Sequence, residues 1–394
     1  MKILFVHNRY KQGGGEDSVM DAEIKLLAEM GLLVFSALKD NNEIDSFKSK
    51  LQVFWEVAHS RQSLKWMREK IRQYEPDIVH IHNFFPLLTP SIYDACIDAG
   101  VPVVQTLHNY RTMCPGGLLM RDGKVCEKCI KGSAYQAVLH GCYRESAIGS
   151  LAVARMVAKH RSMGTWQHKV NRFIALTEFA KNKFIEAGFP EHKIAVKSNF
   201  VVDAGLSEDV NPNKAGALFV GRLSQEKGME TLLNAWRSLN VSLRVAGAGP
   251  LEGELANLTG DKVEALGMLN QDSVRKEMGQ AAFLVMPSEC YEGFPMVLVE
   301  AFSQGLPIIA SRLGGMAEIV TDGVTGLHFE AGNANDLADK VRWMASHPEE
   351  SRQMGRNARR EYEEKYTPDK NYEILMDIYN QAIEDNKQIL NLEP

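Results

Sequence analysis

The chain has 394 residues, which is too long for one ordinary hydrophobic core and predicts two domains. Its composition, 45% hydrophobic and 24% charged, is that of a soluble globular protein, and no segment approaches the roughly 18–20 apolar residues that a membrane span needs. The net charge of −5 combines a basic first half, with 27 Lys and Arg against 20 Asp and Glu in residues 1–200, and an acidic second half, with 18 against 30. We therefore expect different partners for the two domains, and since no nucleic-acid-binding module is recognisable, nucleic acid is not among them.

The first elements are a buried strand, predicted at residues 2–6, and a helix, predicted at residues 19–30. The strand runs directly into polar residues and is too short for the core of a signal peptide, so we expect a cytoplasmic protein. Gly13, Gly14 and Gly15 lie between the two elements. A glycine cluster in this place can cradle a phosphate with its backbone N–H groups, and a plain flexible turn explains it equally well.

Two basic stretches with tryptophan are predicted to be helical. Residues 48–72 hold Trp55, Trp66 and seven basic residues against two acidic ones, and residues 144–172 hold Trp166 and six basic residues against one. Basic amphipathic helices with tryptophan can lie on an anionic membrane surface. A solvated helix face is the competing interpretation, so the pattern leaves open a peripheral contact at the inner face of the membrane.

Three histidines accompany the next two predicted strands, at residues 77–82 and 101–106. His108 follows the end of the second strand, where parallel α/β folds place their chemistry. A histidine there can donate a hydrogen bond to a sugar hydroxyl or titrate near neutrality. His80 and His82 are expected to shape the wall of the cleft and not to react.

Four of the six cysteines form the pattern Cys-x11-Cys-x2-Cys-x12-Cys, at Cys114, Cys126, Cys129 and Cys142. Such spacing is typical of a tetrahedral zinc site. Four thiolates leave no open position, so the zinc would be structural, and it would contribute on the order of 10 kcal/mol to folding. Reduced thiols in a loop, an iron–sulfur cluster and disulfide bonds are the alternatives, although a reducing cytoplasm disfavours disulfides.

The second half of the chain alternates short apolar runs with helical patterns, from the run at residues 217–221 to that at residues 327–329. This alternation predicts a parallel sheet with right-handed crossovers. A polar stretch at residues 205–216 is the predicted linker between the domains. Arg222 and Lys227 fall in a tight loop after the first strand of this half. Two cations that converge at a strand's carboxyl end suit a diphosphate.

A strand, a short loop and a helix are predicted around the sequence SECYEGFPMVLVEAFS. An apolar run ending at Met286 leads through a polar turn to Glu292, and a helical pattern that starts near Met296 carries Glu300. Open parallel sheets bind ligands in such loops, outside the carboxyl ends of their strands. Gly293 allows the backbone to approach a ligand closely, and the helix amino terminus offers unpaired N–H groups to an anion. A surface loop with a solvated helix is the alternative.

These motifs together resemble those of the retaining glycosyltransferases of family 4, the glycosyl transferases group 1. The resemblance rests on Glu-x7-Glu with Gly-Phe-Pro after Glu292, on Gly-Arg-x4-Lys-Gly around Lys227, and on a histidine at the strand end that carries His108. Many members have His-Asp where this chain has His108-Asn109, so Asn109 is not expected to act as an acid or base. The resemblance covers nearly the whole chain.

The fold implied by this resemblance is α/β, with two Rossmann-like domains that face each other across a cleft, the GT-B arrangement. The implied acceptor domain is residues 1–204, with a small Cys-rich insertion at about 111–145, and the implied nucleotide-sugar domain is residues 205–368. Residues 369–394 would form a C-terminal helix that crosses back to the first domain.

The resemblance also implies a role for each motif. Arg222 and Lys227 would hold the diphosphate and Glu300 the ribose hydroxyls, and His108 would face the donor sugar. The implied catalytic residues are His108, Arg222, Lys227 and Glu292, and the implied donor-binding residues are Gly14, Gly15, Arg222, Lys227, Glu292, Gly293, Phe294, Pro295 and Glu300. Because Pro295 has no N–H to donate, its part would be to fix the turn.

The implied activity is transfer of a sugar, with retention of configuration and without a catalytic metal, from a UDP or GDP sugar. The acceptor would be a glycan or a lipid-linked molecule in the biosynthesis of cell-surface polysaccharide. Two rivals stay open on the sequence alone: a sugar-nucleotide epimerase of the same fold, and a non-catalytic scaffold of a polysaccharide assembly complex.

Overall fold

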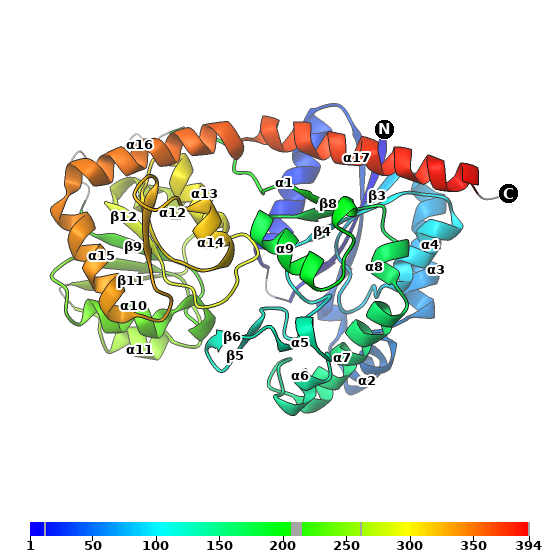
Figure 1. The fold of residues 1–394 in the computed structure, drawn as a ribbon, viewed down its shortest axis with the longest axis horizontal. Coiled ribbons are helices and arrows are strands. Elements are labelled where there is room, and N and C mark those ends of the chain that lie inside the picture. The colour runs from blue at the N-terminus through cyan, green and yellow to red at the C-terminus, as the bar shows by residue number, and fades with distance from the viewer. Residues whose placement is uncertain (12, 206–214, 261, 393–394) are drawn as a thin grey trace. The chain divides into compact units, whose positions relative to one another are not determined.

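The computed structural model describes residues 1–11, 13–205, 215–260 and 262–392 (Figure 1). Most of the predicted linker, residues 205–216, lies outside this part of the chain. Backbone contacts divide the chain into two compact units. Unit 1 consists of Met1–Leu119, Cys126–Ser198 and Asn371–Pro394, and unit 2 of Met120–Val125 and Asn199–Lys370.

Unit 1 is built on a six-stranded parallel sheet with the strand order β2-β1-β3-β4-β7-β8. Its strands are β1 (Lys2–Arg9), β2 (Leu33–Asp40), β3 (Ile78–Asn83), β4 (Val103–Leu107), β7 (Arg172–Ala175) and β8 (Ile194–Val196). The central strands β1, β3 and β4 are buried along nearly their whole length, as expected for strands that are covered on both faces. The strand order reverses between β1 and β3, and such a reversal opens a crevice at the carboxyl ends of the strands.

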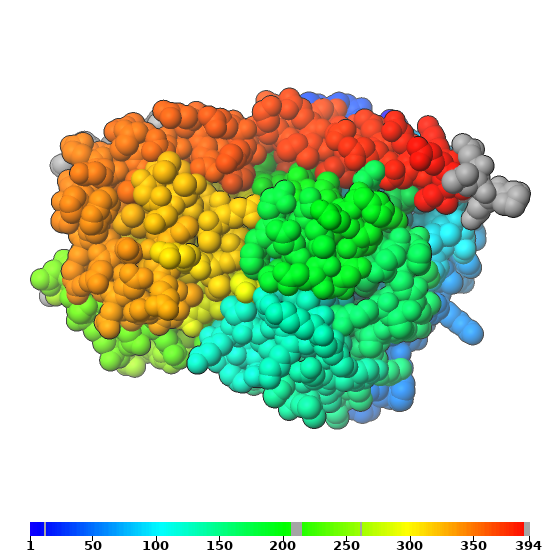
Figure 2. Space-filling model, viewed as in Figure 1, coloured from blue at the N-terminus to red at the C-terminus, as the bar shows by residue number. Residues whose placement is uncertain are grey.

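Helices and a Cys-rich insertion complete unit 1. The helices are α1 (Gly15–Glu29), α2 (Phe47–Glu56), α3 (Arg61–Tyr74), α4 (Ser91–Asp98), α5 (Lys128–Lys131), α6 (Gln136–Leu139), α7 (Ala147–Ser162), α8 (Thr165–His168) and α9 (Glu178–Glu186), with 3-10 turns η1 (Asn41–Glu43) and η2 (Glu191–Lys193). The insertion contains a hairpin of β5 (Met120–Arg121) and β6 (Lys124–Val125), which is grouped with unit 2. From Asn371 onward the last helix, α17 (Pro368–Leu392), belongs to unit 1 and lies along its surface (Figure 2).

Unit 2 has a second six-stranded parallel sheet, with the order β11-β10-β9-β12-β13-β14. Its elements are β9 (Ala217–Val220), η3 (Gln225–Lys227), α10 (Met229–Trp236), β10 (Leu243–Ala246), α11 (Glu252–Ala256), β11 (Val263–Gly267), α12 (Gln271–Gln280), β12 (Phe283–Met286), α13 (Met296–Ser303), β13 (Ile308–Ser311), α14 (Gly314–Ile319), β14 (Gly326–Phe329), α15 (Ala334–Ser346) and α16 (Pro348–Lys365). This is the dinucleotide-binding strand order, and its reversal lies between β9 and β12. Apolar side chains of the sheet and of α10 and α15 form one buried core.

The predicted α/β class with two Rossmann-like sheets is confirmed. The helix predicted at residues 48–72 is instead two helices: α2 ends at Glu56, and Ser60 starts α3 as its N-cap by accepting a hydrogen bond from the N–H of Ser63. The residues predicted as one stretch at 144–172 divide similarly into α7 and α8. No helix in the described part of the chain is long and apolar enough to cross a lipid bilayer.

Candidate functional site

In unit 2, two loops meet where the strand order reverses. The loop after β9 carries Lys227 and ends at Gly228, whose φ of 70° lies in the left-handed region. A Cβ on Gly228 would lie 1.9 Å from the carbonyl oxygen of Pro287, in the loop after β12, so only glycine allows this approach. A backbone hydrogen bond of 3.0 Å, from the N–H of Glu289 to the carbonyl of Glu226, also joins the loops.

Lys227 and Glu292 form an ion pair across these two loops. The Lys227 Nζ atom lies 2.7 Å from Glu292 Oε1, and the hydroxyl of Ser288 donates to the same oxygen at 2.7 Å. Burial by itself would lower the pKa of Lys227, but the neighbouring Glu292 carboxylate raises it above its ordinary value. The ammonium group is therefore charged and held in place at the carboxyl ends of the strands. Arg222 lies exposed at the end of β9.

The other predicted residues of unit 2 surround the start of α13. Phe294 and Pro295 are buried, Gly293 is half-buried, and α13 begins directly after Pro295 without a side-chain cap. Its first backbone N–H groups are therefore not occupied by a capping side chain. Glu300 lies one turn into the helix, half-buried, and burial raises the pKa of its carboxyl group, although the charge of Arg275 acts against this shift.

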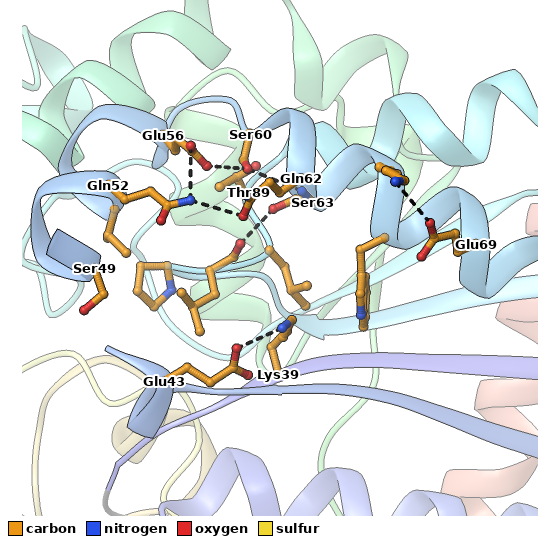
Figure 3. A pocket seen from close by; sticks show the side chains of 16 residues that line it. Lys39, Glu43, Ser49, Gln52, Glu56, Ser60, Gln62, Ser63, Glu69 and Thr89 are labelled. Atoms are coloured by element: carbon orange, nitrogen blue, oxygen red, sulfur yellow. Dashed lines mark hydrogen bonds and ion pairs between the residues drawn. The ribbon is translucent and has the colours of Figure 1, made fainter. Parts of the chain in front are cut away.

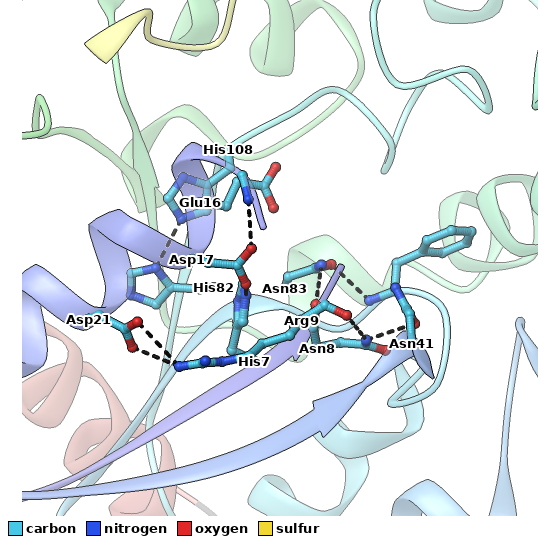
Figure 4. Close-up of polar contacts among 12 residues, drawn as sticks. His7, Asn8, Arg9, Glu16, Asp17, Asp21, Asn41, His82, Asn83 and His108 are labelled. Carbon is cyan, nitrogen blue, oxygen red and sulfur yellow. Dashed lines mark hydrogen bonds and ion pairs between the residues drawn. The ribbon is translucent and has the colours of Figure 1, made fainter. Parts of the chain in front are cut away.

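In unit 1, histidines gather at the carboxyl ends of β1, β3 and β4, again where the strand order reverses (Figure 4). His82 Nδ1 lies 2.9 Å from His108 Nε2, and His7 Nε2 lies 2.8 Å from Asp17 Oδ1. Burial lowers the pKa of His108 well below its ordinary value, and His82 adds to the effect. Of the two roles that the sequence allowed His108, hydrogen bonding and titration near neutrality, its burial therefore favours hydrogen bonding.

Two buried charged residues next to these histidines, Glu23 and Lys197, were not identified from the sequence. Glu23 of α1 is fully buried; its Oε1 accepts a hydrogen bond of 2.5 Å from Lys197 Nζ, and its Oε2 lies 3.3 Å from His82 Nε2. Burial alone would raise the pKa of Glu23, but Lys197 and His82 hold it well below its ordinary value. Glu23 and Lys197 are 174 positions apart, the first within α1 and the second directly after β8, so no local signal marks them as a pair.

The glycine loop of unit 1 leads into the amino terminus of α1. Gly14 is the N-cap, and its N–H donates to Asp17 Oδ2 at 2.9 Å, while a Cβ on Gly14 or Gly15 would meet no atom within 4 Å. The helix starts at Gly15, earlier than predicted. Next to it, Asn109 Nδ2 donates to Glu16 Oε1 at 2.8 Å, so the amide orients a buried carboxyl group.

Unit 1 also has a surface pocket of about 400 Å³ that the sequence did not reveal (Figure 3). It is lined by Trp66 of α3, by the segment after β3 and by a series of carboxylates, amides and hydroxyls. The labelled polar residues are Lys39, Glu43, Ser49, Gln52, Glu56, Ser60, Gln62, Ser63, Glu69 and Thr89. The Ser60 hydroxyl donates to Glu56 Oε2 at 2.6 Å, which fixes one carboxylate of the wall.

The four predicted zinc ligands lie in one neighbourhood, and all six cysteines lie outside disulfide bonds. Burial raises the pKa of Cys129 to about 12, and the nearby thiol groups of Cys114, Cys142 and Cys126 act in the same direction. The ends of the insertion are close, since a Cβ on Gly116 would lie 3.1 Å from the carbonyl oxygen of Cys142. The four sulfur atoms do not all lie within 4.8 Å of one another; among the described residues, the group that meets this distance is Glu23, His80 and His82.

Comparisons with known proteins identify both units. The family model of the glycosyl transferases group 1 matches residues 207–361, and that of Glycosyltransferase Family 4 matches residues 36–204. An uncharacterized glycosyltransferase of Methanocaldococcus jannaschii is 24% identical over 388 residues, which are 94% of this chain and 95% of the relative.

Solved structures with the same fold cover nearly the whole chain. The structure of Anabaena HepE in complex with UDP has a TM-score of 0.65 at 18% identity, and sucrose-phosphate synthase of Thermosynechococcus elongatus has 0.70 at 16% identity. Each match covers 99% of both chains. The fold is therefore that of the GT-B glycosyltransferases. This chain belongs to glycosyltransferase family 4 and is a retaining glycosyltransferase that uses a nucleotide sugar.

Proposed function

We propose that this enzyme transfers a sugar from a UDP or GDP sugar to a glycan or lipid-linked acceptor in the biosynthesis of cell-surface polysaccharide. The Lys227–Glu292 pair carries the proposal, because it holds a charged ammonium and a carboxylate 2.7 Å apart at the strand reversal of unit 2. An ammonium held in advance stabilises the charge that develops on a departing diphosphate. No catalytic metal is required by this scheme, since Lys227 and Arg222 supply the positive charge.

The remaining residues of unit 2 complete the proposed donor site. Glu300 accepts hydrogen bonds from the ribose hydroxyls, and Glu292, with the N–H groups of Gly293 and Phe294, holds hydroxyls of the donor sugar. Support comes from the uncapped amino terminus of α13, which offers donors to an electronegative ligand. In unit 1, His108 contacts the sugar, and Gly14 and Gly15 leave open space for the diphosphate and the acceptor.

UDP is the favoured nucleotide, because related structures of Anabaena HepE contain UDP and UDP-glucose. A thermal-shift screen of the purified protein against UDP, GDP, ADP, CMP and dTDP tests this proposal. A ligand at about 100 times its dissociation constant adds roughly 2.7 kcal/mol to the stability of the native state. A shift with UDP alone supports the proposal, a shift with GDP alone changes the donor, and a folded protein that responds to no nucleotide contradicts it. Release of an epimerised sugar without acceptor identifies the reaction as epimerisation.

The acceptor is proposed to bind in unit 1, with the pocket of Figure 3 as its sugar-binding part. An indole face packs against the apolar face of a sugar ring, while carboxylates and amides accept and donate hydrogen bonds to its hydroxyls. Trp66→Ala should therefore raise the KM for the acceptor and leave the KM for the donor unchanged, as measured in initial-rate kinetics. An unchanged acceptor KM would remove this pocket from the proposal.

The enzyme is further proposed to work in the cytoplasm, in peripheral contact with the anionic inner face of a membrane. The supporting surface is the outer face of α2, where Phe47, Leu51 and Trp55 recur at intervals of four residues and are 80%, 48% and 61% exposed. Arg155 of α7 lies over the Trp55 ring, with its guanidinium carbon 5.5 Å from the ring centroid. Exposed aromatic and aliphatic side chains beside cations suit the boundary of an anionic bilayer.

The Cys-rich insertion is proposed to hold one structural zinc ion through Cys114, Cys126, Cys129 and Cys142. The donor set fits, since four thiol groups share one neighbourhood, although their sulfur atoms would have to move closer to bind one ion. Metal analysis of protein purified without added zinc should give one zinc per chain, and Cys126→Ser with Cys129→Ser should abolish it. Cys96→Ser is the matched control; zinc retained by the double variant would contradict this assignment.

A further inference from the structure

The buried charges beneath His108 have a consequence for its hydrogen bonding. Lys197, Glu23, His82 and His108 form one continuous chain of contacts that starts in the core of unit 1 and ends at the carboxyl end of β4. Each contact constrains which atom carries a proton. Because His108 is the proposed contact to the donor sugar, the inference rests on the proposed function, but the proton positions can be measured without it.

A metal ion between Glu23, His80 and His82 is the first alternative, because their ligand atoms lie within 4.8 Å of one another. Both ring nitrogens of His80 are occupied, however: Nδ1 lies 2.7 Å from the hydroxyl of Tyr379 and Nε2 lies 2.8 Å from that of Thr106. The Lys197 ammonium also binds Glu23 directly. A cation beside the carboxylate and a fully hydrogen-bonded imidazole do not fit a metal site, so the group is a hydrogen-bonded network.

The protons of this network can be placed one after another. The Glu23 carboxylate only accepts hydrogen bonds, so His82 Nε2, at 3.3 Å, must carry the proton between them. Among the described residues, neither of these two buried atoms makes a hydrogen bond of ordinary geometry, so the 3.3 Å contact between them is the polar contact available to both. Lys197 already neutralises Glu23, and a second buried cation would be uncompensated, so His82 is neutral and its Nδ1 accepts.

The proton position on His82 determines that on His108. Its Nε2 lies 2.9 Å from the accepting Nδ1 of His82 and must therefore donate, which leaves Nδ1 of His108 as a bare acceptor. We infer that Glu23 and Lys197 are positioning residues that fix His108 in the Nε2–H tautomer, so that Nδ1 accepts a hydrogen bond from a hydroxyl of the donor sugar. The earlier expectation, that His108 donates to this hydroxyl, is thereby reversed.

The substitution Glu23→Gln should reverse the direction of the hydrogen bonds that link this residue through His82 to His108. The amide oxygen of the new side chain accepts from Lys197, so its NH2 group faces His82 Nε2, which must then accept. His82 would donate from Nδ1 to His108 Nε2, and His108 would carry its proton on Nδ1. Nδ1 of His108 could then no longer accept the hydrogen bond from the sugar hydroxyl, so we expect kcat/KM for the donor to fall roughly 10-fold, as for one lost hydrogen bond.

Long-range proton–nitrogen NMR of protein with 15N-labelled histidine identifies the protonated nitrogen of each ring. In the natural protein, His108 should carry its proton on Nε2, and a proton on Nδ1 overturns the inference, even if Glu23→Gln does not fold. Tyr379→Phe is the control, because it removes a hydrogen bond from the same network and should leave the tautomer of His108 unchanged.

The two hypotheses can fail separately. If His108 is found as the Nε2–H tautomer and no nucleotide sugar binds, the proposed function fails and the inference stands. If the sugar nucleotide binds and Glu23→Gln changes neither the tautomer nor kcat/KM, the positioning role of Glu23 is refuted and the proposed function stands.

Discussion

The ion pair between Lys227 and Glu292 sets the chemistry of unit 2 at the scale of single residues. The pair joins the loop after β9 to the loop after β12. Backbone contacts hold these loops together as well, since Gly228 packs against the carbonyl of Pro287. Lys227 is therefore held in place before any ligand binds, and little reorganisation is needed when charge develops. Replacing Lys227 by an uncharged residue should therefore remove most of this stabilisation of the developing charge.

Lys227→Ala should lower kcat about 100-fold or more, because it removes a charge that is held in advance. Lys262→Ala provides a matched control, since Lys262 is an exposed lysine of the same unit that bonds to Asn240 at 2.6 Å. Initial rates with saturating donor, together with circular dichroism of both variants, make the comparison. A folded Lys227→Ala enzyme with near-normal kcat would remove Lys227 from the mechanism.

Asp203 and Arg359 give unit 2 a small dependence of stability on pH. The hydrogen bond from Arg359, at 2.6 Å, lowers the pKa of Asp203 below its ordinary value of 3.8. A carboxyl group with a lowered folded pKa contributes stability above its unfolded pKa and loses it as the pH falls through the folded pKa. Because the Asp203 side chain is exposed to water, the contribution is at most about 1 kcal/mol.

Asp203→Asn should therefore lower the melting temperature slightly at pH 7, and the difference from the natural protein should shrink as the pH falls below about 4. Thermal melts at both pH values test this expectation. Asp339→Asn is a comparable exposed carboxylate in unit 2, paired with Arg342 three residues later, and should show a weaker effect. A difference that grows on acidification would mean that Arg359 does not stabilise ionised Asp203.

At the scale of elements, local patterns predicted most of the fold. Apolar runs bounded by glycine and polar turns marked the strands of unit 2, and the motif loops follow β9 and β12 because functional residues sit at strand ends. The strand β2 (Leu33–Asp40) was missed, since only Ala37 of this edge strand is buried and the strand carries no strict alternation. The network of Glu23 and Lys197 was missed because only the folded topology brings those two residues together.

The helix α2 is the element that tests the membrane proposal. Replacing Phe47, Leu51 and Trp55 together by Ser should weaken binding to vesicles that contain anionic phospholipid, because each exposed apolar side chain contributes by leaving water. Co-sedimentation with such vesicles measures the change. The matched control replaces Met268 and Val324, two exposed apolar residues of unit 2. Equal loss of binding in both variants, or undiminished binding of the α2 variant, would contradict a specific role for this face.

At the scale of the whole molecule, the C-terminal helix connects the end of the chain to the core of unit 1. Asn371 donates to the carbonyl of Ser198 at 2.8 Å, Asn386 donates to that of Gly100 at 2.8 Å, and the Tyr379 hydroxyl contacts His80 across 299 positions of sequence. The division expected from the sequence, at residues 204 and 368, remains a prediction about where independently folding domains end. The contacts of α17 support the expectation that the end of the chain belongs to the first domain, because unit 1 without this helix would expose buried polar groups.

Tyr379→Phe isolates the most buried of these contacts. The change leaves Nδ1 of His80 without its partner in a fully buried position, which costs about 1–3 kcal/mol. For a unit of this size we expect the melting temperature to fall by roughly 2–4 °C per kcal/mol. Tyr372→Phe, on the same helix but only half-buried, is the matched control and should melt like the natural protein. If both variants melt alike, the hydroxyl of Tyr379 contributes nothing specific, and the attachment of α17 must depend on its apolar side chains, such as Leu375 and Ile378, which are buried in the same interface.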